Sequence, residues 1–125
     1  MEFVKTDKAP KAVGPYSQAV VSGNFVFVSG QIPLDPETGK MVEGDIEEKT
    51  RRVLENVSAV LESVGLSLKN VVKVTVFITD LSNFEKVNKV YSEFFGDHKP
   101  ARSFVEVSAL PKGAEIEIEV IAEKG

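Results

Sequence analysis

The chain has 125 residues, which is the size of one domain and leaves no room for a second. Its 15 basic and 19 acidic side chains give a net charge of −4, which argues against a protein built mainly to hold nucleic acid, and the absence of cysteine excludes disulfides and thiolate metal sites. No signal peptide is visible in the first ten residues, and no apolar run is long enough to span a bilayer, so we expect one cytoplasmic domain over residues 1–125 with no membrane partner.

The first half of the chain predicts three short strands, a loop and a helix. Apolar runs at residues 3–4, 19–21 and 25–28 are typical of strands, and residues 22–24 predict a hairpin between the last two. Glycine and proline make residues 31–44 a long loop. Asp45 and Glu48 then have the spacing of a capping box, followed by one apolar stripe that ends before Gly65. The stripe consists of Val53, Leu54, Val57, Val60, Leu61 and Val64.

The second half predicts a strand, a helix and two further strands. From residue 71 to 79 the period is two, so Val72, Val74, Val76 and Ile78 should share one face and Lys73, Thr75, Phe77 and Thr79 the other. Ser82 and Glu85 suggest a second capping box for a helix that ends before Gly96. Residues 102–109 and 115–121 predict the last two strands, with a turn at residues 111–113.

The resulting order is β-β-β-α-β-α-β-β, an α+β fold in which two helices cover one face of a sheet. The other face should mix Phe77 with Lys73 and Thr75, and should also carry Arg102 and Phe104. A half-apolar sheet face is usually buried by another copy of the chain, so the pattern predicts a homo-oligomer.

Most catalytic constellations are missing from the sequence. Without cysteine, the single histidine cannot form a structural zinc site or a Cys–His pair, and we expect no metal. His98 lies in a short polar connection, where a solvated loop residue is the simpler interpretation than a catalytic one. There is also no phosphate-binding loop and no nucleophile elbow.

Arg102 is the arginine whose surroundings are unusual. Arg51 and Arg52 fall on the exposed flank of the first helix, whereas Arg102 enters a strand with apolar neighbours. A guanidinium there could hold a carboxylate through two parallel hydrogen bonds, or it could form an ion pair with a neighbouring glutamate. The residue alone does not choose between these interpretations.

Three carboxylates alternate with apolar residues in the last predicted strand. Glu115, Glu117 and Glu119 should therefore line one face, and mutual repulsion should disfavour ionisation of the central one. Such a glutamate could orient or deprotonate a water molecule. The alternative is a solvated strand that resists aggregation through its charges.

Asn88 interrupts the apolar stripe of the second helix. Its amide either ties a loop to that helix or contacts a ligand.

Three motifs in order resemble the reactive intermediate deaminase A family, which is also called RidA, YjgF or liver perchloric-acid-soluble protein. They are Gly-Pro-Tyr-Ser-Gln-Ala at residues 14–19, Ser-Gly-Gln-Ile-Pro at 29–33, and Pro-Ala-Arg-Ser at 100–103 followed by Ile-Glu-Ile-Glu at 116–119. The resemblance spans essentially the whole chain, and it implies a chorismate-mutase-like mixed sheet in a homotrimer with a central barrel and sites between subunits.

The resemblance also implies an activity. Members of the family hydrolyse 2-imino acids or their enamine tautomers to 2-oxo acids and ammonia. Pyridoxal-phosphate enzymes release these imines and enamines as reactive intermediates. The deaminase itself needs no cofactor and no metal. Its partners are then the small 2-imino or 2-oxo acid and its own copies.

Residue by residue, the resemblance assigns Arg102 to the substrate carboxylate and Glu117 to the hydrolytic water. It gives Tyr16 the task of holding that water or the substrate nitrogen. Without the family, Tyr16 would be interpreted as an aromatic residue in a turn.

The remaining pocket positions are Ser29, Gly30, Phe104 and Asn88. Ser29 and Gly30 would line the pocket, although Ser29 alone looks like a strand-end hydroxyl. Main-chain groups at Phe104 would contact the ligand, and this phenylalanine stands where many deaminating members have cysteine. Asn88 matches a further position counted with the substrate-binding residues, and its part there is expected to be structural.

Two other functions stay open on the sequence. Some relatives are described as single-strand ribonucleases and inhibitors of translation, although the acidic balance and the lone histidine make nucleic acid an unexpected partner here. A non-catalytic binder of small 2-oxo carboxylates, with Arg102 as its anchor, is the second alternative.

Overall fold

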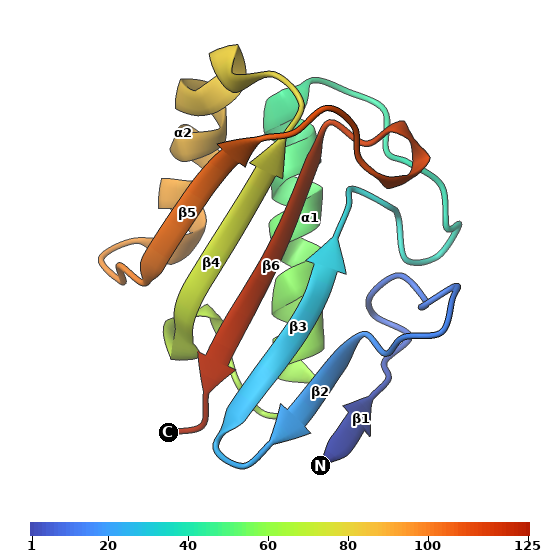
Figure 1. Cartoon of the computed structure of the whole chain (residues 1–125), viewed down its shortest axis with the longest axis vertical. Helices are drawn as coiled ribbons and strands as arrows, with labels where there is room; N and C mark the ends of the chain where they lie inside the picture. The colour runs from blue at the N-terminus through green and yellow to red at the C-terminus, as the bar shows by residue number, and fades with distance from the viewer.

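Six strands form one sheet with two α-helices behind it in the computed structural model, which describes all of residues 1–125 (Figure 1). The strands are β1 (Glu2–Val4), β2 (Ala19–Ser22), β3 (Phe25–Gln31), β4 (Val71–Ile78), β5 (Ala101–Glu106) and β6 (Ile116–Glu123). The helices are α1 (Ile46–Glu62) and α2 (Phe84–Phe95), with three short 3-10 turns at Leu68–Asn70, Leu81–Asn83 and Pro111–Gly113. None of these helices is both long enough and apolar enough to cross a membrane.

The strand order across the sheet is β1-β2-β3-β6-β4-β5. Neighbouring strands run antiparallel except for β4 and β5, which are parallel and joined through α2. The predicted α+β fold with a mixed sheet is therefore confirmed. The last strand in the chain lies in the middle of the sheet.

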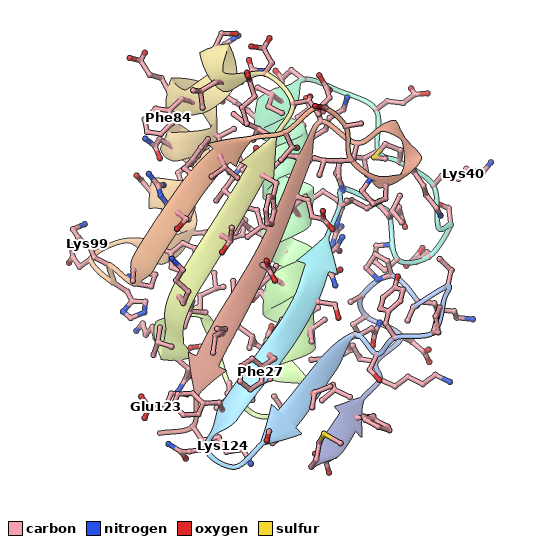
Figure 2. The ribbon with its side chains drawn as sticks, viewed as in Figure 1. Phe27, Lys40, Phe84, Lys99, Glu123 and Lys124 are labelled. Carbon is pink, nitrogen blue, oxygen red and sulfur yellow. The ribbon has the colours of Figure 1, made fainter.

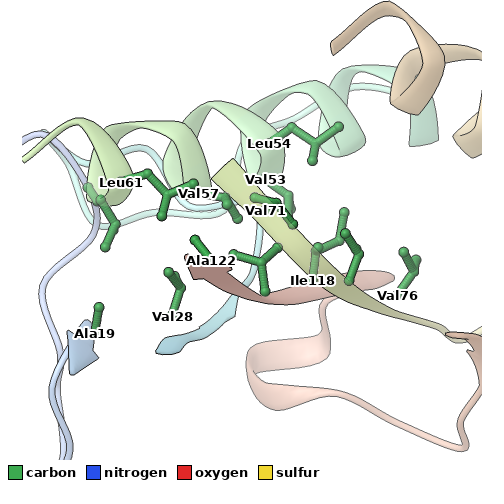
Figure 3. Close-up of a cluster of buried hydrophobic side chains, with 14 of the residues drawn as sticks. Ala19, Val28, Val53, Leu54, Val57, Leu61, Val71, Val76, Ile118 and Ala122 are labelled. Carbon is green, nitrogen blue, oxygen red and sulfur yellow. The ribbon is translucent and has the colours of Figure 1, made fainter. Parts of the chain in front are cut away.

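The first helix forms with the predicted cap residue and apolar stripe, although no return hydrogen bond from the Glu48 side chain completes the predicted capping box. Asp45 caps it by accepting a hydrogen bond from the Glu48 amide at 2.9 Å, and the predicted apolar stripe packs onto the sheet (Figure 3). Buried valines and isoleucines of β3, β4 and β6 meet this stripe from the other side. The two layers enclose one core.

A β-bulge changes the face assigned to the start of β4. Val71 is 1% exposed and Val72 is 38% exposed, so Val72 does not share a face with Val74 as predicted. The register against β6 shifts between Val71 and Lys73, because the bulge places one extra residue in β4. Val71 therefore faces the helices and Val72 does not. From Val74 onward the predicted alternation is correct.

The second predicted capping box is wrong. Asp80, rather than Ser82, acts as the cap, and its carboxylate accepts a hydrogen bond from the Ser82 amide at 3.0 Å. That cap begins a 3-10 turn, and α2 starts only at Phe84 without a side-chain cap of its own. The side chains still follow the predicted helical stripe, because the turn leads directly into the helix.

One face of the sheet is free of helices and faces the viewer in Figures 1 and 2. Its apolar residues include Phe27 of β3, Phe77 of β4 and Val105 of β5. Its polar residues include Lys73 and Thr75 of β4, and the strand registers place all of them on this face. Phe27 and Val105 are 45% and 39% exposed. The predicted half-apolar open face is thus present in the chain.

Two residues predicted for that open face lie on the other side. In the parallel register, Arg102 pairs with Val74 and Phe104 with Val76, so both point toward the helices. The Phe104 ring packs against Phe84 of α2, with ring centroids 4.6 Å apart. β5 also ends at Glu106 instead of residue 109, so only five residues of the predicted strand join the sheet.

Candidate functional site

Tyr16, Gly30 and Glu117 line one cavity of about 120 Å³ at the edge of the open face. Glu117 comes from β6, Gly30 from the irregular end of β3, and Tyr16 from the loop before β2. A Cβ atom on Gly30 would overlap the Glu117 carboxylate, so the two residues are in close approach. The sequence prediction that these three residues belong together is consistent with this geometry.

The Glu117 carboxyl has a pKa raised above its usual range, mainly because it is half buried and secondly because Glu119 lies nearby. The upward direction agrees with the sequence argument. Burial is the larger cause, however, and the charge repulsion that the sequence predicted is the smaller one. Glu115 takes no part, because it precedes β6 and its carboxylate pairs with Lys49 of α1. Two carboxylates, rather than three, therefore remain on this stretch of the open face.

Ser29 connects the strand to the loop that carries Tyr16. Its hydroxyl donates to the Ser17 carbonyl at 2.6 Å, and its amide donates to the Gln18 carbonyl at 2.9 Å. The hydroxyl proton of Ser29 is thus engaged in a hydrogen bond within the chain. Ser29 does not itself line the cavity beside Glu117, and its hydrogen bonds tie β3 to the loop that carries Tyr16.

Gln18 is a buried residue that the sequence analysis did not single out as part of a site. Its side-chain oxygen accepts from the Thr6 amide at 2.7 Å, and its NH2 group lies within 3.2 Å of three main-chain carbonyls, those of Thr6, Ala9 and Pro10. The segment before Tyr16 is therefore fixed to β2 by one amide. The feature of the sequence that could have pointed to Gln18 is its position directly after Tyr16 and Ser17.

Arg102 lies in a second cluster, on the helix-covered side of the edge strand β5. Its Nη1 atom donates to Asn88 Oδ1 at 2.7 Å, and its guanidinium carbon lies 4.7 Å from the centre of the Tyr91 ring. No carboxylate pairs with it, so the glutamate ion pair that the sequence left open is absent. Figure 2 labels Phe84 and Lys99 at this edge of the molecule.

Asn88 does not tie a loop to the second helix, which was one of the two sequence interpretations. Its side chain is partly buried, and its amide oxygen accepts a hydrogen bond from the Arg102 guanidinium. Phe104 turns its ring toward Phe84 and away from the open face. Both residues therefore surround Arg102.

A single chain does not bring Arg102 and Glu117 together. β4 lies between their strands, which separates the strand axes by about 10 Å, and the two side chains point to opposite faces of the sheet. The cavity beside Glu117 and the surface beside Arg102 are lined by different residues. The candidate site residues thus form two separate clusters, one around Glu117 and one around Arg102.

His98 is more than a solvated loop residue. Its Nε2 atom lies 2.7 Å from the Val71 carbonyl, and its ring stacks near Phe95 at 6.3 Å. The prediction of a freely solvated histidine is wrong, because the connection folds back against the start of β4. Nowhere in the chain do three or more His, Asp or Glu side chains gather in a way that could hold a metal ion.

Comparison with known proteins decides the family. The family model described as endoribonuclease L-PSP matches residues 6–124. The chain belongs to the L-PSP family. The solved structures that resemble it include RidA of a Psychrobacter species and the YjgF gene product of Escherichia coli, so the family predicted from the sequence is confirmed.

Individual relatives of this L-PSP chain cover nearly its full length. A RutC family protein of Pyrococcus abyssi is 62% identical over 98% of the chain and 97% of its own length. The crystal structure of a candidate endoribonuclease of Thermotoga maritima is 68% identical, with a TM-score of 0.98 over 100% of this chain and 98% of that one. TdcF of E. coli, whose name describes it as a candidate reactive intermediate deaminase, is 47% identical over 97% of this chain and 95% of its own length. The structure of TdcF with bound serine has a TM-score of 0.95 at 45% identity and covers all of both chains.

Proposed function

We propose that this chain hydrolyses 2-iminobutanoate, 2-iminopropanoate and their enamine tautomers to 2-oxo acids and ammonia. The observation that carries the proposal is the unneutralised guanidinium of Arg102. Arg51 and Arg52 each lie within ion-pair distance of a glutamate, whereas Arg102 has only the neutral Asn88 amide. The Arg102 guanidinium has no anionic partner within the chain, and a small carboxylate would supply one. The serine bound in the TdcF relative carries such a group.

We further propose that the active form is a homotrimer in which Arg102 of one subunit meets Tyr16 and Glu117 of the next. Two observations support this arrangement. The open face of the sheet exposes Phe27 and Val105, and burial against another copy would remove that apolar surface from water. The two clusters also lie on opposite faces of one chain, so a site that uses both Arg102 and Glu117 needs a second copy of the chain.

The proposed mechanism uses position more than nucleophile strength. Arg102 holds the carboxylate and so fixes which face of the C=N bond meets water. As water adds to the imine carbon, Glu117 accepts one of its protons and passes it to the nitrogen, which gives a carbinolamine. Glu117 then takes the hydroxyl proton and delivers it to the amino group as the C–N bond breaks, so that ammonia leaves and the carbonyl forms. Tyr16 holds the water or the nitrogen. Acid–base assistance of this kind is worth about 10²–10⁴ in rate.

The pKa of Glu117 suits this role. A carboxyl whose pKa is raised is a stronger base than an ordinary glutamate once it is ionised, and it gives its proton back more readily than water does. Half-burial supplies this shift without a metal or a cofactor.

The direct test generates 2-iminobutanoate with threonine dehydratase while semicarbazide competes for the imine. The wild type should divert imine from semicarbazone to 2-oxobutanoate, and Arg102→Ala and Glu117→Ala should not. Light scattering of all three proteins serves as the control for assembly. A wild type that leaves the semicarbazone rate unchanged would refute the deaminase proposal.

A mixing experiment tests the arrangement between subunits. If each site takes Arg102 from one subunit and Glu117 from the next, randomly mixed trimers of the two inactive variants regain about one quarter of the wild-type sites. If both residues acted within one chain, mixing would restore no activity.

Single-strand ribonuclease activity is the alternative that the family description and the Thermotoga maritima relative favour by name. The residues support it less well. The single histidine has Nε2 at the Val71 carbonyl, and Glu117 and Glu119 would repel a phosphate chain. Cleavage of RNA by metal-free wild type, lost in Arg102→Ala or Glu117→Ala, would establish this alternative.

A non-catalytic binder of 2-oxo carboxylates would also use Arg102. It predicts calorimetric binding of 2-oxobutanoate without any change in imine lifetime. The competition assay and calorimetry together separate it from the deaminase.

A further inference from the structure

Helix α2 presents one row of side chains to the edge strand that carries Arg102. Phe84, Asn88 and Tyr91 are spaced by four and three residues, so they lie on the same face of the helix. Each of them contacts or covers the Arg102 guanidinium. Phe104, two residues along β5 on the same face, adds a third ring.

We propose that Phe84, Asn88, Tyr91 and Phe104 form a guanidinium cage that positions Arg102 for a substrate carboxylate while leaving its charge unneutralised. The inference rests on the proposed function, because it takes Arg102 as the carboxylate anchor. These four are positioning residues, since they act through Arg102.

The aromatic part of the guanidinium cage fixes the plane of the group. The guanidinium carbon lies 4.7 Å from the Tyr91 centroid, 5.1 Å from that of Phe104 and 5.8 Å from that of Phe84. All three distances are within the range of a cation–π contact. Phe84 and Phe104 also hold each other edge to face at 61°, so the cage is braced before any ligand arrives.

The polar part of the cage is neutral. Asn88 Oδ1 occupies one N–H of Nη1 at 2.7 Å and stops rotation of the group, as a carboxylate would. Unlike a carboxylate, an amide leaves the positive charge in place for an incoming anion. An aspartate at this position would make a stronger bond to Arg102 and would remove the reason for a ligand to bind.

Tyr91 contacts the guanidinium with its ring. Burial raises the pKa of its hydroxyl, and the Arg102 cation lies close enough to lower that pKa against the larger effect of burial. The hydroxyl oxygen is buried and has no hydrogen-bond partner. Tyr91→Phe keeps the ring, whereas Tyr91→Leu keeps apolar volume and removes the ring. This pair separates the cage from simple packing.

The first test needs no ligand. The chain has three arginines, so its arginine Nε–H signals are few, and Arg102→Lys identifies the one that belongs to Arg102. Because a ring shields protons above its face, we expect this signal to be shifted upfield in the wild type and in Tyr91→Phe. It should move toward the position of a free arginine in Tyr91→Leu and Phe104→Leu. An Arg102 signal at the free position in the wild type would overturn the cage, whatever the enzyme does.

The second test measures charge. In calorimetry with 2-oxobutanoate, Asn88→Asp should weaken binding by about 100-fold, because the new ion pair competes with the ligand. Lys86→Gln is the matched control, since it changes the net charge by the same amount on an exposed part of α2 that does not touch Arg102. In turnover, Asn88→Asp should raise KM far more than it lowers kcat.

The outcomes are distinct from those of the proposed function. If Asn88 only supported the fold, Asn88→Asp would bind 2-oxobutanoate as well as the wild type does, and that result would overturn the inference. If the wild type shows the shifted arginine signal and binds 2-oxobutanoate but leaves imines untouched, the deaminase proposal fails and the cage stands. If the wild type binds no 2-oxobutanoate, the cage has no carboxylate to serve and the inference fails with it.

Discussion

Gly30 lies where an added methyl group would strike the candidate base. A Cβ atom on Gly30 would overlap the terminal oxygen of Glu117 and come within 3.0 Å of its Cγ. The backbone of Gly30 itself does not require glycine, since it is not among the glycines with positive φ. Gly30→Ala therefore acts on the carboxylate and not on the main chain.

The effect on stability should be small and the effect on activity large. The atom that must move is the end of a flexible, half-exposed side chain, and an alanine that fits its backbone gains about 0.4–1 kcal/mol through the unfolded state. We expect the free energy of unfolding to change by less than about 1 kcal/mol. A base displaced by about 1 Å should cost about 100-fold or more in kcat/KM.

A double-mutant cycle makes the assay decisive. Imine hydrolysis in competition with semicarbazide is measured for Gly30→Ala, Glu117→Ala and the double variant, and urea unfolding is measured for all three. Glu117→Ala should keep only the small part of the rate that does not use the carboxylate, and in that background the glycine substitution should cost nothing further, because the carboxylate that it displaces is gone. Equal losses in both backgrounds, or a fully active Gly30→Ala, would refute the reasoning.

Three other substitutions test the surroundings of the Glu117 and Arg102 clusters. Because burial and Glu119 raise the pKa of Glu117 in the folded state, its ionisation destabilises the fold above that raised pKa and has no such effect below the ordinary value. Glu117→Gln should therefore raise the free energy of unfolding at neutral pH, and the gain should fade in urea titrations as the pH falls through that window; an unchanged gain at low pH would contradict this. Gln18→Leu leaves several main-chain groups near Thr6 without partners and should lower the free energy of unfolding by about 2–4 kcal/mol, with Lys8→Gln as the exposed control. Tyr91→Phe removes a buried hydroxyl without a partner, so thermal unfolding should show equal or higher stability, and a loss of more than about 1 kcal/mol would mean that the hydroxyl is bonded after all.

Sequence patterns predicted an element correctly where the residues that determine it lie within the element or next to it in the chain. The α1 helix needs only Asp45 as its cap and a stripe of apolar residues, and both lie within the helix and its first neighbour. The alternation from Val74 to Ile78 is equally local. These segments formed as expected.

The errors concern features that depend on a distant strand. The bulge that exposes Val72 exists only against β6, which is more than forty residues further along the chain. The face of Arg102 depends on the parallel register with β4, which sequence alternation within β5 cannot specify. Glu115 leaves the predicted row of carboxylates because Lys49, from another element, pairs with it.

The candidate residues were found from motifs, and their separation was found only from the fold. Motif order names Arg102 and Glu117 together, yet the sheet puts β4 between them. The sequence predicted an apolar stripe on the second helix, and such a stripe does not reveal that two of its rings, Phe84 and Tyr91, lie beside the Arg102 cation.

The central position of β6 has a consequence for synthesis on the ribosome. β3 and β4 are both made long before β6, but neither pairs with the other, since β6 lies between them. Each half of the sheet therefore emerges with an unpaired edge that the last strand alone can close. Chains interrupted before residue 116 should accumulate as aggregates, and the glutamate proposed as the base arrives with the same strand that completes the sheet.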